Sequence, residues 1–234
     1  MLEHTIIWDF DGTILPINPY DSEQTLLHYI ITCREYRTSL FKRLSGRVVI
    51  YADQRGWFPD YFKRAYNWLL KGTSVELLDR VAEELAAKIS AVDRQAIHSL
   101  KRSGYKMMVL SCGTADLSTR ILRAAGLADC FSFLEGNWFL IENGKIKGMD
   151  FHIPTPESKL ELLLEHGITA EQAVAIGDGY TDLPLLNWAA IPVLLDRKGE
   201  KRAICMSKGY HHAASVPEAA EIVAEIIKKT DNPV

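Results

Sequence analysis

The feature that most limits the fold of this chain is a short apolar run, Thr5 to Trp8, which ends abruptly in Asp9-Phe10-Asp11-Gly12-Thr13. A continuous apolar run of this length is typical of a strand buried on both faces, as in a parallel sheet covered by helices. In such sheets, ligands bind beyond the carboxyl ends of the strands. We therefore expect an α/β fold with the two aspartates at its ligand-binding edge.

The alternation of strand and helix returns after Asp93. Asn143-Gly144 predicts a hairpin between short strands around Phe139 and Ile146. Further strands are expected over 106–110, 173–176, 191–195 and 211–215, and helices over 94–103, 116–125, 156–167 and from Pro217 onwards. This order predicts a doubly wound parallel sheet with helices on both faces.

The segment 16–88 has a different character, because helical periodicity dominates it and it holds 11 of the 22 aromatic residues. Helices are expected after a cap at Asp21 or Ser22, over 59–70, and over 75–89, while 47–51 is expected to form a short strand. The predicted organisation is a catalytic core formed by 1–15 and 89–234, with a small helical cap, 16–88, inserted after the first strand.

The composition and charge of the chain argue against nucleic acid and membranes as partners. The chain has 27 basic and 30 acidic side chains, so no excess of positive charge indicates nucleic acid. No stretch approaches the roughly 18 consecutive apolar residues of a membrane span, and the N-terminus does not resemble a signal peptide. The four cysteines are widely separated, as expected of reduced thiols. We expect a cytoplasmic protein without a membrane or nucleic-acid partner, and the oligomeric state stays open.

Carboxylates follow two of the predicted strands: Asp9 with Asp11, and Asp178 with Asp182. Carboxylates this close repel one another, and a divalent cation would remove that penalty. Oxygen ligands suit Mg²⁺, and an aspartate can also attack phosphorus as a nucleophile. The alternative is a simple turn in which the carboxylates accept hydrogen bonds from local N–H groups.

Ser111 ends the strand 106–110. Its hydroxyl, with the N–H groups near Cys112 and Gly113, could hold a phosphate oxygen, although an ordinary strand-to-helix turn is the alternative. The Cys112 thiol has no evident basic partner and is expected to be a bystander.

Lys159 is expected in the first turn of a helix that begins at Thr155-Pro156-Glu157. A cation there opposes the helix dipole, so a phosphate and an aspartate are reasonable partners, and a surface lysine is the alternative. In Gly177-Asp178-Gly179-Tyr180-Thr181-Asp182 the glycines allow a tight turn. Asp182 could then reach back to Lys159 or to a metal-bound water, or it could simply belong to a capped helix start.

In this order, the four motifs resemble those of the haloacid dehalogenase superfamily of phosphohydrolases. Asp9-Phe10-Asp11-Gly12-Thr13 is similar to the first motif, Ser111 to the second, Lys159 to the third, and the segment from Gly177 to Asp182 to the fourth. The helical insert lies where the family places a cap. Within the superfamily, the chain is most similar to the phosphoserine-phosphatase-like branch.

The resemblance implies a Mg²⁺-dependent phosphomonoesterase acting on a small phosphorylated metabolite. Asp9 would form an aspartyl phosphate, and Asp11 would act as general acid and base. Mg²⁺ would be held by Asp9, the carbonyl oxygen of Asp11, and Asp178. Ser111 and Lys159 would bind the phosphoryl group, and Asp182 would support Lys159 or the metal.

The substrate stays open at this point. Phosphoserine phosphatases carry a glutamate seven residues beyond the second aspartate, where this chain has Asn18. Glu23 could take over that role, but the sequence gives no reason to expect it, so phosphoserine specificity does not follow and other small phosphate esters stay open. A phosphotransferase using the same intermediate and a non-catalytic binding protein on the same fold are the alternative functions.

Overall fold

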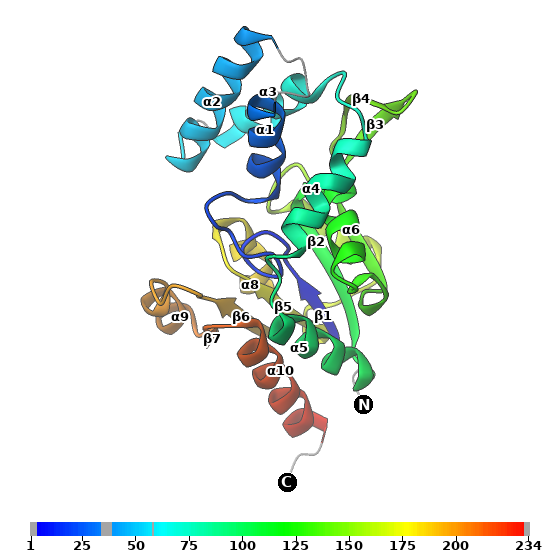
Figure 1. Ribbon diagram of the computed structural model, residues 1–234. Coiled ribbons are helices and arrows are strands. Elements are labelled where there is room, and N and C mark those ends of the chain that lie inside the picture. The colour runs from blue at the N-terminus through cyan, green and yellow to red at the C-terminus, as the bar shows by residue number, and fades with distance from the viewer. Residues whose placement is uncertain (1–3, 34–38, 58, 232–234) are drawn as a thin grey trace.

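Thr5–Trp8 forms the central strand, β1, of a seven-stranded sheet with the order β4-β3-β2-β1-β5-β6-β7. The computed structural model describes residues 4–33, 39–57 and 59–231 (Figure 1). Its further strands are β2 (Lys106–Thr114), β3 (Phe133–Glu142), β4 (Lys145–Asp150), β5 (Ala173–Gly177), β6 (Ile191–Leu195) and β7 (His211–Ala213). Every pairing is parallel except that of β3 with β4, which form the expected hairpin. The predicted α/β fold is confirmed.

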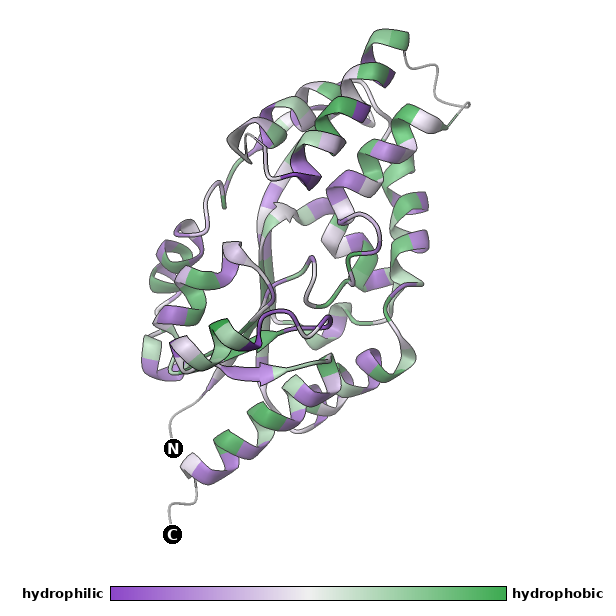
Figure 2. Ribbon diagram, turned by 90° about the vertical axis from the view of Figure 1, so that its left-hand side faces the viewer, coloured by the Kyte–Doolittle hydropathy of each residue, from purple (hydrophilic) through white to green (hydrophobic). Residues whose placement is uncertain are grey.

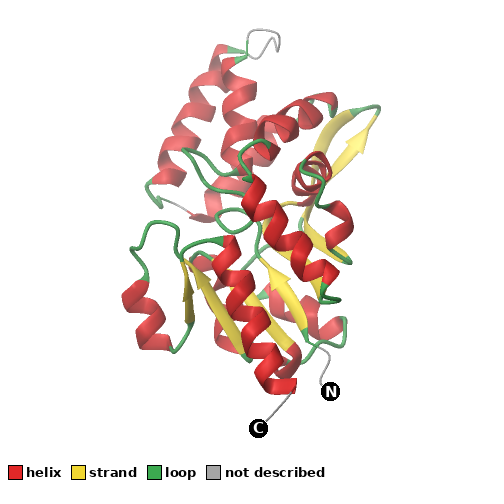
Figure 3. Ribbon diagram, turned by 60° about the horizontal axis from the view of Figure 1, so that its bottom comes forward, coloured by secondary structure: helices red, strands yellow, loops and turns green. Residues whose placement is uncertain are grey.

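Both faces of the sheet are covered by helices (Figure 3). Successive side chains of a strand point to opposite faces, so Ile6 and Trp8 join one apolar cluster while Ile7 joins the other. The first cluster includes residues of α5 (Ala91–Arg102), α6 (Ala115–Ala124) and α10 (Val216–Asp231). The second includes residues of α7 (Ser158–Glu165), α8 (Leu183–Trp188) and α9 (Arg202–Lys208). Hydrophobic and hydrophilic positions alternate along these helices (Figure 2).

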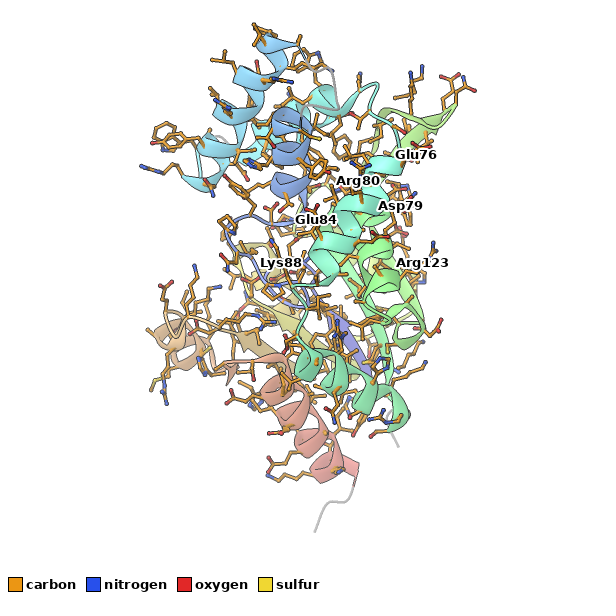
Figure 4. The ribbon with its side chains drawn as sticks, viewed as in Figure 1. Glu76, Asp79, Arg80, Glu84, Lys88 and Arg123 are labelled. Atoms are coloured by element: carbon orange, nitrogen blue, oxygen red, sulfur yellow. The ribbon has the colours of Figure 1, made fainter. Side chains whose placement is uncertain are left out.

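The segment after β1 forms α1 (Ser22–Thr32), α2 (Leu40–Gln54), α3 (Pro59–Leu70) and α4 (Glu76–Ala86). The Asp21 side chain caps α1 by accepting a hydrogen bond from the Gln24 N–H at 2.7 Å. Helix α4 lies along α6 (Figure 1), and Asp79 of α4, labelled in Figure 4, pairs with Arg120 of α6. The division into a core and a cap at residues 16 and 88 stays a prediction.

Three elements differ from the predicted secondary structure. The expected strand 47–51 lies inside α2. The β-branched residues of this segment indicated a strand. In the structure, Val49 and Ile50 are buried while Val48 faces solvent, and two adjacent buried residues fit a helix but not the alternating burial of a strand. The helix expected from Pro156 begins at Ser158. Helix α9 was not expected at all.

The chain passes between the sheet and helices α1 to α4 twice, and a hydrogen bond connects the two linking segments. Lys88, which follows α4 and is labelled in Figure 4, donates from Nζ to the carbonyl oxygen of Asn18 at 2.9 Å. Asn18 belongs to the first linking segment, between β1 and α1. None of the helices in the described ranges is long and apolar enough to span a bilayer.

Candidate active site

Asp9, Asp178 and Asp182 meet at the carboxyl ends of β1 and β5. These strands are neighbours in register, with Trp8 opposite Ile176, so the residues that follow them emerge side by side. One carboxylate oxygen from each of the three aspartates lies within 4.8 Å of the others. Three convergent hard oxygen donors match the ligand preference of Mg²⁺. We call these three residues the acidic cluster.

Lys159 reaches the acidic cluster from the first turn of α7. Its side chain is 0% exposed, and Nζ donates to Oδ1 of Asp9 at 2.8 Å and to Oδ1 of Asp182 at 2.7 Å. Burial by itself would lower the pKa of Lys159, but Asp182 and Asp9 raise it above its ordinary range. Lys159 is therefore a fixed positive charge in contact with two buried carboxylates.

The electrostatics of the acidic cluster favour a further cation. Burial, together with the charges of Asp182 and Asp178, holds the pKa of Asp9 well above its ordinary value despite Lys159. Burial likewise raises the pKa of Asp178, against the opposing effect of Lys201. The negative charge therefore exceeds what the nearby lysines neutralise, and a bound divalent cation would restore the ionised state. Both the donor atoms and the charge fit Mg²⁺.

The loop after β5 folds around Asp182. Its Oδ2 accepts hydrogen bonds from the N–H groups of Asp178 and Gly179, both at 3.0 Å. A Cβ on Gly177 would lie only 2.5 Å from the Cβ of Asp182, so no larger residue fits there. Asp182 thus binds Lys159 with one oxygen and orders the Asp178 loop with the other.

Gly12 brings the first and fourth motifs into contact. A Cβ built at this position would overlap the carboxylate of Asp178, and the backbone φ of +88° already favours glycine. The glycine therefore allows the loop after β1 to approach Asp178 closely.

The side chain of Asp11 is bound by the first turn of α1 and does not belong to the acidic cluster. The Ser22 N–H donates to Oδ1 at 2.8 Å, and the Ser22 hydroxyl donates to Oδ2 at 2.7 Å. Burial raises the pKa of Asp11 to about 6, and the two bonds from Ser22 limit the rise. A carboxyl group with such a pKa can both donate and accept a proton near neutral pH.

Ser111 and its neighbours lie beside Asp11. A Cβ on Gly113 would be 3.0 Å from Oγ of Ser111 and 3.2 Å from Oδ2 of Asp11, which places these groups around one small space. The Gly113 N–H donates to Oγ of Ser111 at 2.9 Å. Burial raises the pKa of Cys112 to about 11, so its thiol stays protonated near neutrality. The predicted phosphate contacts of Ser111, Cys112, Gly113 and Lys159 stay predictions.

Three further contacts of the site were not foreseen. The sequence indicates Ser22 only as a candidate helix cap, whereas in the structure it binds Asp11. Lys201 donates to the carbonyl oxygen of Asp178 and, at 3.2 Å, to its Oδ2. Buried Glu23 pairs with Lys63 and accepts a hydrogen bond from the hydroxyl of Thr114 at 2.6 Å. Lys201 follows the carboxyl end of β6, and that position is the one sequence signal that could have pointed to it.

The chain is similar in sequence to known proteins. The sequence model of the haloacid dehalogenase-like hydrolase family matches residues 4–190. A phosphoserine phosphatase of Archaeoglobus fulgidus is 32% identical over 135 residues, which cover 56% of this chain but only 38% of the relative. The phosphoserine phosphatase of Albidiferax ferrireducens is 25% identical over 197 residues, covering 79% of this chain and 80% of the relative.

Solved structures match over nearly the whole chain. The structure described as a phospho-aspartyl intermediate analogue of phosphoserine phosphatase has a TM-score of 0.67 at 18% identity, covering 97% of this chain and 99% of its own. A hydrolase structure from Salmonella enterica has a TM-score of 0.66 at 20% identity, with 91% of this chain and 67% of its own covered. At these identities the likeness concerns the fold.

Proposed function

Because the chain belongs to the haloacid dehalogenase-like hydrolase family, we propose that it is a Mg²⁺-dependent phosphomonoesterase that works through an aspartyl phosphate on Asp9. The observation that carries this proposal is Lys159, fully buried and bonded to both Asp9 and Asp182. A buried lysine beside two carboxylates stabilises a site in which an anionic phosphoryl group has to approach an anionic nucleophile.

In the first step, a carboxylate oxygen of Asp9 attacks phosphorus, and the bond between phosphorus and the ester oxygen breaks. Asp11 gives its proton to that leaving oxygen, so the product departs as a neutral alcohol. Lys159 and Ser111 balance the charge on the transferring phosphoryl oxygens. The Asp11 pKa of about 6 fits this donation at slightly acidic to neutral pH.

In the second step, Asp11, now ionised, takes a proton from a water molecule that attacks the phosphorus of the aspartyl phosphate. The acyl phosphate bond breaks, which frees Asp9 and releases inorganic phosphate. The contact with Ser22 holds Asp11 in one place through both proton transfers.

Asp9, Asp178 and the carbonyl oxygen of Asp11 would hold Mg²⁺. When it is bound, Mg²⁺ supplies positive charge that offsets the repulsion between the phosphoryl group and the carboxylates. Asp182 keeps the Asp178 loop in position for this task through its two backbone hydrogen bonds.

Glu23 and Lys63 support a zwitterionic substrate such as phosphoserine. Glu23 is next to Ser22, so this pair of opposite charges lies close to Asp11, where the leaving alcohol would be. An ammonium group could bind Glu23 while a carboxylate binds Lys63. Phosphoserine would then be preferred over phosphoethanolamine, which lacks the carboxylate, and over phosphoglycolate, which lacks the ammonium group. Glu23→Gln should lower kcat/KM for phosphoserine about tenfold or more, with less effect on an aryl phosphate.

The test of the catalytic proposal is Asp9→Asn, which keeps the shape of the side chain but removes the nucleophile. It should abolish Mg²⁺-dependent hydrolysis of an aryl phosphate while the circular dichroism spectrum stays unchanged. Full activity in this variant would refute the mechanism. Product analysis with a competing alcohol separates hydrolysis from phosphoryl transfer.

A further inference from the structure

The outer surface of α2 carries an unusual concentration of exposed apolar side chains. Of the 17 large apolar residues exposed in the described part of the chain, eight lie between residues 40 and 68. We call the surface formed by the following six the outer cap face: Leu40, Phe41, Leu44, Val48, Tyr51 and Trp68, which are 46% to 77% exposed. The helix lies at the outer edge of the molecule (Figure 1).

Helix α2 is apolar on two opposite sides. One side carries Gly46, Val49 and Ile50, which are buried, and Gly46 is in close contact with Ile31 of α1. Leu40, Leu44, Val48 and Tyr51 follow one another at steps of four, four and three residues, which puts them on the opposite side. The packing of the cap accounts for the first stripe but not for the second. An exposed apolar surface of this kind indicates an interaction site.

Basic residues surround the outer cap face. Residues 39–72 contain seven basic and two acidic side chains, a net charge of +5. Because the whole chain carries −3, all other residues together carry −8. Arg47, Arg55 and Arg64 are exposed, and none of them forms an ion pair with another described residue. An apolar surface accompanied by exposed arginines, on an otherwise acidic protein, matches an anionic partner.

A groove beside the stripe adds a place for an apolar chain. It lies between α2 and α3, has a volume of about 350 Å³, and is lined by Phe41, Val49, Tyr61 and Trp68, with Arg64 also at its wall. Phe41 and Trp68 meet edge to face, with ring centroids 6.1 Å apart. Apolar walls beside a guanidinium group suit an acyl chain below an anionic headgroup.

We propose that the outer cap face docks the protein on the surface of an anionic phospholipid bilayer. Helix α2 would lie in the plane of the interface, with Leu44 and Val48 among the acyl chains and the arginines at the level of the lipid phosphates. Trp57 and Tyr51, which contact each other at 5.9 Å, would occupy the headgroup region that these residue types favour. This proposal departs from the expectation of no membrane partner, which rested on the absence of a membrane-spanning run, because contact of this kind requires no such run.

Charge argues against the obvious rival, a second copy of the chain. A symmetric dimer brings the same patch of both copies together, so the exposed arginines of the two copies, Arg47, Arg55 and Arg64, would face each other. An anionic lipid surface attracts each of these basic groups instead, and the attraction should weaken as salt rises.

The test is co-sedimentation of the full chain with phosphatidylcholine vesicles, with and without about one third phosphatidylglycerol, in roughly 0.05 M and 0.5 M salt. We expect binding to the anionic vesicles at low salt, and much weaker binding at high salt or to neutral vesicles. Arg47→Gln with Arg55→Gln and Arg64→Gln should reduce binding by about fivefold per arginine, or about 100-fold in total, from about 1 kcal/mol each. The matched control, Arg102→Gln with Arg123→Gln and Arg202→Gln, removes three exposed arginines elsewhere and should bind like the wild type.

A second pair of variants tests the apolar part. Leu44→Ser with Val48→Ser should abolish vesicle binding, while Val92→Ser with Leu164→Ser, changes at sites of similar exposure on the core, should not. Hydrolysis of a water-soluble phosphate ester should be unchanged in all of these variants, so a failure of the catalytic proposal would not be confused with a failure of this one. Absence of binding to anionic vesicles, or equal binding by the patch and control variants, would overturn the proposal. The proposal would also be overturned if the wild-type protein did not bind vesicles but formed a dimer that Leu44→Ser with Val48→Ser converts to monomers.

Discussion

Replacing Lys159 with methionine should destabilise the metal-free protein strongly. Methionine is apolar and of similar length, so the change mainly removes the charge and leaves the Asp9 and Asp182 carboxylates buried without their shared partner. Removing one member of a buried ion pair costs about 3–5 kcal/mol, because an uncompensated charge stays in the interior. A domain of this kind has about 5–15 kcal/mol of total stability, so the loss would be a large fraction.

The assay is urea unfolding followed by circular dichroism in EDTA at about pH 8 and about pH 5. The loss should be smaller at the lower pH, because the raised pKa of Asp9 lets that carboxyl take up a proton and shed its charge. Lys229→Met is the matched control, since Lys229 forms a solvent-exposed pair with Glu225 at 2.6 Å, and exposed pairs contribute little to stability. A loss below about 1 kcal/mol for Lys159→Met, or the same loss at both pH values, would refute this reasoning.

Three other predictions concern the site. Ser22→Ala should slow the hydrolysis of alkyl phosphates about tenfold or more but affect that of p-nitrophenyl phosphate little, because only a poor leaving group needs the proton of Asp11. Ser22→Thr, which keeps the hydroxyl group, should restore the rate. Gly12→Ala should weaken Mg²⁺ binding, measured by calorimetry, because the added Cβ would displace Asp178. The control is Gly72→Ala, at a residue with a φ of +87° and open space around it, which should cost only about 1 kcal/mol of stability and leave Mg²⁺ binding intact. Mg²⁺ should raise the melting temperature more at about pH 8 than at about pH 5, because metal binding needs the ionised carboxylates. The raised pKa values of Asp9 and Asp178 mean that the metal-free fold becomes more stable as the pH falls towards the ordinary aspartate value of about 3.9. Equal shifts of the melting temperature at both pH values would contradict this prediction.

The sequence carried most of the information about the sheet edge. Asp9 and Asp178 follow buried strands, and in a parallel sheet such positions converge regardless of the intervening chain. The contact between Lys159 and Asp182 was also among the expected alternatives, because a lysine in the first turn of a helix needs an anionic partner. These inferences depended on strand order and local electrostatics, both of which leave a pattern in the sequence.

The contacts between distant segments left no such pattern. The bond from Ser22 to Asp11 depends on how α1 is placed above the sheet, and the bond from Lys201 to Asp178 depends on the loop after β6. The strand expected over 47–51 failed for a related reason. Local β-propensity indicated a strand, but helical packing of Gly46 against Ile31 of α1 overrode it.

The central position of β1 has a consequence for biosynthesis. Its neighbours, β2 and β5, begin at Lys106 and Ala173, so the strand that precedes Asp9 leaves the ribosome long before either partner exists. Helices α1 and α2 are synthesised in between, and they pack against each other through contacts that are closer in sequence. One edge of β1 can pair with β2 once that strand has been made, but its other edge stays unpaired, or has to be shielded by a chaperone, until β5 has emerged. Translation that pauses before Ala173 would prolong this exposure and favour aggregation of the nascent chain.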